Sequence, residues 1–226
     1  MTNLPAAVLA TARAMNVAGI NRGAAGNVSA RCADGFIITP TGMAYDDCVA
    51  GDMAKVSIGV APPEVGAGGM KCPAWGTAIG GRKPSSEWRF HHDIYAARPE
   101  AGAIIHTHAP FATALACHGI EIPPFHYMIA RFGGDTVRCA AYATFGTQAL
   151  SDAILAALQN RCACLMAHHG MVVFGADLKA ALALAIEFEA LCEQFWRVLQ
   201  LGQPQLLPAD EMARVMEKFR NYGKQE

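Results

Sequence analysis

The sequence is poor in charge and lacks several patterns that would assign it to common classes of protein. Charged residues make up 16% of its 226 residues and the formal net charge is -1, so no footprint for nucleic acid or an anionic membrane is expected. No apolar run has the length of a membrane span. Arg13 interrupts the Ala-rich stretch from Met1 to Met15 and no basic segment precedes it. This stretch therefore predicts an amphipathic helix, not a secretory signal, and favours the cytoplasm.

Several catalytic signatures are also missing. The eight cysteines include no C-x-x-C pair, so they are expected to be reduced core residues and not a zinc thiolate cluster. No G-x-S-x-G elbow is present, which argues against a serine hydrolase. The glycines between Asn21 and Ala30 precede a strand, so they do not form the dinucleotide fingerprint. Such a turn could offer backbone N–H groups and the Asn27 amide to an anion, or be a tight hairpin turn only.

Hydrophobic residues make up 53% of the chain, which is enough for one substantial core and predicts a single domain over residues 1–226. Between Gly59 and Pro84 the chain is rich in Gly and Pro, which indicates a long surface excursion. Periodicity and punctuation predict strands at 36–38, 137–143, 162–167 and 171–174, and helices at 5–18, 111–118, 148–159, 178–200 (capped by Asp177) and from Pro208 to near Tyr222.

The most informative stretch is an apolar run from Ala103 that ends in His106-Thr107-His108 and a proline. It predicts a buried strand that stops at a polar site. Side chains alternate along a strand, so His106 and His108 point the same way, about 7 Å apart. Two such imidazoles can converge on one ion, and zinc accepts neutral imidazole nitrogens. The alternative is a pair of hydrogen-bonded histidines at a strand end.

A second histidine pair, His168-His169, follows the predicted strand 162–167. One of the two must face away on an extended backbone, so only one is expected to join His106 and His108 as the third ligand of a catalytic zinc site. Glu87 and His91 form a rival metal pair at helical spacing, with His92 as a further candidate. Histidines on helices are more often packed or exposed than ligands.

The stretch Pro84-Ser85-Ser86-Glu87 predicts a helix start, with Ser85 or Ser86 as the cap and Glu87 in the first turn. Two hydroxyls at a helix N-terminus can seat a phosphate group. The same residues would also serve as plain capping.

Taken together, eight motifs give the sequence a family resemblance that spans nearly the whole chain in one order. They are Gly-x-x-Gly-Asn-Val-Ser (23–29), Ile-Thr-Pro-Thr-Gly (38–42), Pro-Ser-Ser-Glu-Trp-Arg-Phe-His (84–91), His-x-His-Ala (106–109), His-Tyr-Met-Ile-Ala (126–130), Tyr-Ala-Thr-Phe-Gly-Thr (142–147), His-His-Gly (168–170) and Glu-Lys-Phe-x-x-Tyr-Gly (217–223). The sequence resembles class II aldolases of the L-fuculose-1-phosphate aldolase type, in the aldolase/adducin family. It departs from them in a longer excursion from about Ile58 to Arg82.

The resemblance implies an α/β fold with three layers, in which helices flank a central, mainly antiparallel sheet. It implies one zinc ion per subunit, with Mn²⁺ or Co²⁺ as possible substitutes, and a homotetramer whose active sites lie between subunits. Its implied metal ligands are Glu87, His106, His108 and His169, and its acid/base groups are Glu87 and, from a neighbouring subunit, Tyr127. The implied phosphate pocket is Gly26, Asn27, Thr41, Gly42, Ser85 and Ser86, and the implied aldehyde side is bordered by Phe145, Phe219 and Tyr222.

The implied reaction is reversible cleavage of a deoxy-ketose 1-phosphate to dihydroxyacetone phosphate and an aldehyde. Bound zinc would act as a Lewis acid, Tyr127 would take the proton of the C4 hydroxyl and Glu87 would return one to C3. The substrates considered are the 1-phosphates of L-fuculose, 5-deoxyribulose and 5-methylthioribulose. A sugar-phosphate epimerase, dehydratase or 3-oxo-acid phosphate decarboxylase on the same scaffold, or a non-catalytic adducin-like interaction module, are the alternatives.

Overall fold

The computed structural model describes residues 3–58 and 82–221 of the chain, so most of the expected excursion, and Tyr222, lie outside the described residues. A sheet of seven strands runs through the molecule in the order β3-β2-β1-β4-β7-β6-β5. Every neighbouring pair is antiparallel except β5 with β6, which confirms the mainly antiparallel sheet. The strands are β1 (Asn27–Cys32), β2 (Gly35–Ile38), β3 (Ala54–Ser57), β4 (Ala103–Thr107), β5 (Cys139–Ala140), β6 (Ala163–Met166) and β7 (Gly170–Gly175).

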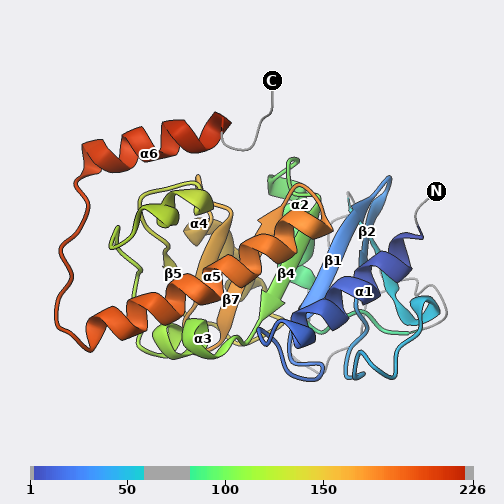
Figure 1. Ribbon diagram of the computed structural model, residues 1–226. Helices are drawn as coiled ribbons and strands as arrows, with labels where there is room; N and C mark the ends of the chain where they lie inside the picture. The colour runs from blue at the N-terminus through green and yellow to red at the C-terminus, as the bar shows by residue number, and fades with distance from the viewer. Residues whose placement is uncertain (1–2, 59–81, 222–226) are drawn as a thin grey trace.

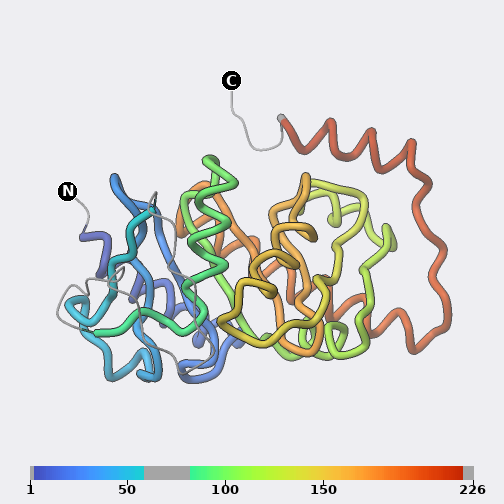
Figure 2. Tube along the Cα trace, turned by 180° about the vertical axis from the view of Figure 1, so that it is seen from behind, coloured from blue at the N-terminus to red at the C-terminus, as the bar shows by residue number. Residues whose placement is uncertain are grey.

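Helices cover both faces of this sheet and complete the expected three layers. One face carries α1 (Leu4–Val17), α3 (Pro110–Cys117) and α5 (Leu178–Leu199), which are in front in Figure 1. The other face carries α2 (Trp88–Ala97) and α4 (Gln148–Ala157), seen from behind in Figure 2. Two short 3-10 helices, η1 (Ala50–Asp52) and η2 (Tyr127–Phe132), lie in connections. The last helix, α6 (Ala209–Asn221), follows a long connection and packs on η2 at the periphery.

Strand β4 shows how the sequence places the polar site. It is buried along its whole length, and its side chains alternate between the two cores, with Ile105 packed toward α1 and α5 and Ile104 toward α2 and α4. His106 shares the face of Ile104, and its ring meets the edge of Phe90 of α2 at 5.6 Å between centroids. The alternation therefore directs the first histidine of the His-x-His motif toward the N-terminal half of α2.

Side-chain caps fix the helices that frame the site. Asp177 accepts the backbone N–H of Ala180 at 2.7 Å and begins α5, as expected. Glu189, within α5, accepts the N–H groups of Phe111 and Ala112 at 2.8 and 2.9 Å, so a carboxylate from another helix caps α3. This long-range cap ties α3 to α5 on one face of the sheet.

Three expectations from the sequence need correction. Helix α2 begins at Trp88 and not at the serines, because Pro84 forms a bridge with Pro40 and holds the next residues in a turn. The expected strand 137–143 shrinks to Cys139–Ala140, since Val137 pairs separately with Ile122. The seven cysteines in the described ranges are free, but Cys117 is exposed and is not a core residue. Within residues 3–58 and 82–221, no helix combines the length and apolar character needed to cross a membrane.

Candidate metal centre and its cleft

Three strand ends meet at one place in the sheet. The register pairs Asn27, the first residue of β1, with His106 near the end of β4, and pairs Thr107 with Met171 near the start of β7. His108 follows β4 directly and His169 precedes β7 directly. The antiparallel pairing thus brings together two histidine motifs that lie about sixty residues apart in the sequence.

Two glycines allow the chain to close around this place. A Cβ at Gly26 would lie 2.3 Å from the carbonyl oxygen of His106, and one at Gly170 would lie 2.4 Å from that of Thr107. Neither separation is possible for a real side chain, so both neighbours of β4 must lack one here. The hydroxyl of Tyr45 donates to the carbonyl of Gly26 and anchors the turn from the other side.

Glu87, His106, His108 and His169 form one cluster, with one ligand atom from each lying within 4.8 Å of the others. The three imidazole rings are mutually edge-on, with centroids 4.8 to 5.0 Å apart. Glu87 stands at the N-cap position of α2 with 6% of its surface exposed. Its Oε2 lies 3.1 Å from His106 Nε2 and its Oε1 lies 3.1 Å from His169 Nε2.

The donor atoms of this cluster fit a divalent cation. His106 Nε2 and Glu87 Oε1 are buried and have no partner in hydrogen-bond geometry, although each lies close to another member of the cluster. Buried polar atoms are rarely left unsatisfied, and a cation between them would satisfy both. His106 Nδ1 donates to the carbonyl of Met171 at 2.9 Å, which leaves Nε2 as the lone-pair nitrogen that faces the cluster.

Electrostatics within the cluster favour the metal-binding protonation states of Glu87 and His108 but not that of His106, whose pKa burial would lower and the Glu87 carboxylate raises above its ordinary value. Burial alone would raise the pKa of Glu87, but attraction to His106 and His169 outweighs it and holds that pKa below its ordinary value. Burial, together with repulsion from the other two imidazoles, lowers the pKa of His108 to about 4. At neutral pH the cluster therefore offers an ionised carboxylate and a neutral His108.

The other histidine candidates lie outside this cluster. His168 adopts a left-handed backbone with φ of 55°, and its ring meets Tyr142 edge-on, so only His169 of the pair turns inward, as expected. The rival helical arrangement is not formed, because His91 bonds to Asn27 and Ser29, and His92 bonds to Asp93. Glu87 instead joins the histidines from the strand ends.

A buried hydrogen-bonded chain behind Glu87 was not anticipated from the sequence. Asn27 donates from its amide nitrogen to Glu87 Oε2 at 3.0 Å, and its amide oxygen lies 2.5 Å from His91 Nε2. His91 Nδ1 lies 2.7 Å from the hydroxyl of Ser29, which lies 2.8 Å from that of Tyr95. Glu87, His91 and Tyr95 are spaced four residues apart, which places them on one face of a helix, and this spacing could have predicted their proximity. The position of Ser29 beside His91 could not be predicted without the fold.

The residues expected to bind phosphate approach the cluster from two segments. The Pro40–Pro84 bridge, together with bonds from Ser85 N to Thr39 O and from Thr41 N to Lys83 O, aligns the segment holding Thr41 and Gly42 with the one holding Ser85 and Ser86. Thr41 and Gly42 are exposed, Ser85 is buried and its Oγ accepts the N–H of Glu87. The Asn27 side chain is engaged with Glu87 and His91 instead of facing this segment.

A cleft of about 350 Å³ opens over the cluster. It is lined by Ala25, Ser86, Glu87, His108, Tyr142, Ala143, Phe145, His168 and His169. Phe145, which was expected to border the aldehyde, lines this cleft with 57% of its surface exposed. Polar ligand atoms on one side and aromatic rings on the other give the cleft a metal-binding wall and an apolar wall.

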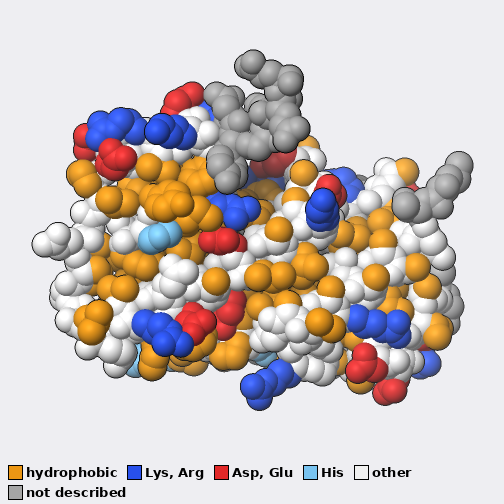
Figure 3. Space-filling model, in the orientation of Figure 1, with side chains coloured by type: hydrophobic (Ala, Val, Ile, Leu, Met, Phe, Trp, Pro, Cys, Tyr) orange, Lys and Arg blue, Asp and Glu red, His pale blue; other side chains and the backbone are white. Residues whose placement is uncertain are grey.

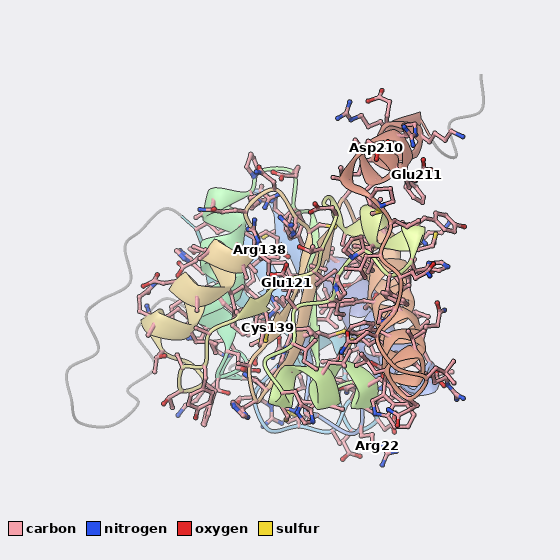
Figure 4. The ribbon with its side chains drawn as sticks, turned by 90° about the vertical axis from the view of Figure 1, so that its left-hand side faces the viewer. Arg22, Glu121, Arg138, Cys139, Asp210 and Glu211 are labelled. Carbon is pink, nitrogen blue, oxygen red and sulfur yellow. The ribbon has the colours of Figure 1, made fainter. Side chains whose placement is uncertain are left out.

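Tyr127 and Phe219 lie at a different cavity, about 390 Å³ in volume, between η2 and α6. Their rings are stacked with centroids 6.4 Å apart, and Tyr127 is 50% exposed. Hydrophobic side chains gather below α6 on the face shown in Figure 3. Figure 4 places Asp210 and Glu211 of α6 at the opposite end of the molecule from Arg22, which belongs to the Gly-rich turn beside the cluster. The structure therefore does not bring these two aromatic residues to the metal cluster of their own chain.

Comparisons with known proteins agree with this geometry. The family described as Class II Aldolase and Adducin N-terminal domain matches residues 6–196. A 5-methylthioribulose-1-phosphate/5-deoxyribulose-1-phosphate aldolase from Rhodospirillum rubrum is 52% identical over 212 residues, covering 94% of this chain and 89% of that protein. The L-fuculose phosphate aldolase of Escherichia coli K12 is 40% identical over 217 residues, covering 96% and 94%.

The fold comparison gives the same result. A solved L-fuculose 1-phosphate aldolase superposes with a TM-score of 0.87 at 30% identity, covering 97% of both chains. The resemblance read from the motifs is thereby confirmed. The chain belongs to the class II aldolase and adducin family.

Proposed function

We propose that the protein is a metal-dependent class II aldolase that cleaves a 5-deoxy-ketose 1-phosphate reversibly to dihydroxyacetone phosphate and an aldehyde. The observation that carries the proposal is the buried cluster of one carboxylate and three imidazoles that opens on a cleft. The relative at 52% identity is named for 5-methylthioribulose 1-phosphate and 5-deoxyribulose 1-phosphate. These are therefore the substrates we put first, ahead of L-fuculose 1-phosphate.

Glu87, His106, His108 and His169 would hold the metal ion, and zinc is the ion we propose. Three imidazole nitrogens with a further position for a carboxylate or substrate is a donor set typical of catalytic zinc, although Mn²⁺ and Co²⁺ can use the same ligands. When bound, such an ion supplies Lewis-acid stabilisation of the negative charge that develops on the substrate oxygens.

Glu87 is the group we propose to move the proton at C3. When the C3–C4 bond breaks, its electron pair remains with the C2–C3 unit, which must gain a proton to become dihydroxyacetone phosphate. Glu87 lines the cleft and its Oε1 accepts no hydrogen bond, so in the direction of aldehyde addition the ionised carboxylate can take this proton from C3. In cleavage it would return to C3 a proton acquired from solvent.

Neutral donors would bind the phosphate group in this proposal. They come from the Thr41–Gly42 turn and Ser85–Ser86, next to the N-terminus of α2. Gly26 and Asn27 belong to the same proposed pocket, but the Gly26 N–H donates to Asn21 and the Asn27 amide is engaged with Glu87 and His91. Backbone N–H groups at a helix N-terminus favour an anion without a full positive charge. This suits a protein with a net charge of -1.

Tyr127 would act on the cleft of a neighbouring subunit, which requires a homo-oligomer, and we propose a homotetramer. Its exposed ring and its position at another cavity support this arrangement. Its hydroxyl would take the proton of the C4 hydroxyl as the aldehyde leaves. In the same proposal Phe145 borders the aldehyde from the subunit's own cleft and Phe219, beside Tyr127, borders it from the neighbour. Tyr222 keeps its expected role at the aldehyde side.

The experiment that tests the proposal is a coupled assay of dihydroxyacetone phosphate release. It uses the 1-phosphates of 5-methylthioribulose, 5-deoxyribulose and L-fuculose, with and without a chelator. Release that a chelator abolishes and added zinc restores is the expected result. A protein that holds its metal yet releases nothing from any of them would contradict the aldolase and point to another reaction of the family.

A further inference from the structure

The hydrogen-bonded chain behind Glu87 has a direction that the structure determines. A carboxylate only accepts, so the Asn27 amide must present its nitrogen to Glu87 Oε2 and its oxygen to His91. His91 must then donate from Nε2 and accept at Nδ1. It follows that Ser29 donates to His91, and Tyr95 donates to Ser29. Every donor in the chain points toward the carboxylate.

This arrangement divides the work of the two carboxylate oxygens. Oε2 accepts the Asn27 N–H, whereas Oε1 is buried and accepts no hydrogen bond, although His169 Nε2 lies 3.1 Å from it. A 180° flip of the Asn27 side-chain amide would exchange the positions of its nitrogen and oxygen. The flipped amide would then place its oxygen next to Glu87 Oε2, where two acceptors would repel each other. The His91 N–H prevents this because it needs the amide oxygen as its acceptor.

We propose that His91 is a positioning residue for the acid/base step, held by Ser29 and Tyr95, and that it acts by fixing the Asn27 amide so that Oε1 of Glu87 is the oxygen that exchanges a proton with C3. The inference rests on the proposed function. His91 is completely buried between Phe36 and Phe90 and does not line the cleft. Its influence on the substrate therefore passes through Asn27 and Glu87.

A purely packing role would not call for these polar groups. His91, Ser29 and Tyr95 are buried among the apolar residues that join α2 to β1 and β2, where apolar side chains would pack without the cost of desolvation. A buried polar network offsets the free-energy cost of its desolvation only when every polar group in it has a hydrogen-bond partner. Here each side chain of the network has its partners, and the last hydrogen bond runs from the Asn27 amide to the Glu87 carboxylate.

The test compares two substitutions at position 91 in the full-length, metal-loaded protein. His91→Phe keeps a flat ring between Phe36 and Phe90 but removes the donor, whereas His91→Gln restores an N–H near the position of Nε2. Cleavage kinetics are measured alongside the exchange of the C3 proton of dihydroxyacetone phosphate in D₂O. In that exchange Glu87 takes the proton and returns a deuteron from solvent, with no aldehyde involved. Metal content and melting temperature are recorded for each variant.

For His91→Phe we expect kcat and the exchange rate to fall together by about tenfold, as for the loss of one bond supporting a charged group. KM and metal content should stay at the wild-type level, and His91→Gln should recover most of both rates. Ser29→Ala and Ser29→Thr form a second pair, in which the threonine retains the hydroxyl, and this pair decides the question if His91→Phe does not fold.

Wild-type rates in His91→Phe, or equal losses in the glutamine and phenylalanine variants with metal and melting temperature preserved, would overturn the positioning role. Loss of metal together with activity in both variants would also overturn it, because the chain would then serve the metal site. If the wild type itself neither cleaves nor exchanges, the proposed function fails and takes this inference with it.

Discussion

The two regions to which we assign a function in our proposal differ in how complete they are. The metal cluster is buried, its four members come from one chain, and its ligands are supported by a carbonyl, a glycine on each side of β4 and a hydrogen-bonded chain. The Tyr127–Phe219 region lies at the periphery, between a short 3-10 helix and the last helix, and presents an aromatic hydroxyl to the exterior. The first region gathers its polar groups within one chain, whereas the second leaves Tyr127 half exposed at the surface.

The sharpest way to test the first region is Glu87→Gln. This substitution keeps the shape of the side chain and an oxygen for the metal but removes the group that accepts the proton. We expect turnover to fall by about 10²- to 10⁴-fold, as for the loss of a general acid/base. Metal content, measured by elemental analysis, should remain near that of the wild type. Turnover close to normal would exclude Glu87 as the acid/base group.

The matching test of the second region is Tyr127→Phe, which removes one exposed hydroxyl. We expect cleavage to slow by about 10²-fold, the lower end for acid/base groups, because solvent can partly replace a group at an open site. Proton exchange into dihydroxyacetone phosphate should survive, since that half-reaction uses Glu87 and the proposed metal ion but not Tyr127. Light scattering serves as the control for assembly. Loss of both reactions together with assembly would make Tyr127 a structural residue.

A third prediction concerns the close packing of β4 against β7 beside the cluster, where no space is left for a side chain at Gly170. Gly170→Ala should lower the free energy of unfolding by about 1 to 3 kcal/mol, because its Cβ would overlap the carbonyl of Thr107. Gly51→Ala is the matched control, since nothing lies within 4 Å of the added carbon there. Chemical denaturation of both variants gives the measurement. Equal stability of the two would mean that β4 and β7 can separate more easily than their packing indicates.

The smallest effect is expected at the apolar wall of the cleft. Phe145→Ala should raise KM for a substrate with an apolar tail by about three- to tenfold, less than full burial of such a group would give, because the ring is half exposed. Its unfolding free energy should change by less than about 0.5 kcal/mol. Leu201→Ala, an exposed apolar residue away from the cleft, is the control and should leave KM unchanged. An equal effect on both would remove Phe145 from the substrate site.

The sequence predicted the parts of this structure that depend on local pattern. The apolar run before His106 and the run before His168 are strands. Only one histidine of the second pair joins the cluster, as predicted, but the predicted reason was wrong, because His168 lies in a turn with φ of 55° and not on an extended backbone. The family motifs identified the fold, which is confirmed. The roles assigned to the phosphate and aldehyde residues stay predictions.

What the sequence could not supply is pairing between distant segments. The Pro40–Pro84 bridge delays the start of α2, and the pairing of Val137 with Ile122 shortens β5. Neither partner can be read from the neighbouring residues. The same holds for Ser29, whose place behind Glu87 depends on the register of β1 against β4 and on where α2 crosses them.

The edges of the sheet limit how copies of this chain can associate. One edge is β5, only two residues long, with Arg138 directly before it and Glu121 nearby in Figure 4. Within residues 3–58 and 82–221 the other edge is β3, four residues long, where Lys55 pairs with Asp34. Short strands beside charged groups are poor templates for continuing a sheet from one molecule to the next. Self-association of the described part of the chain through open-ended strand pairing is thereby discouraged, so the proposed homotetramer would have to form through helices and loops, whose packing can close into an assembly of finite size.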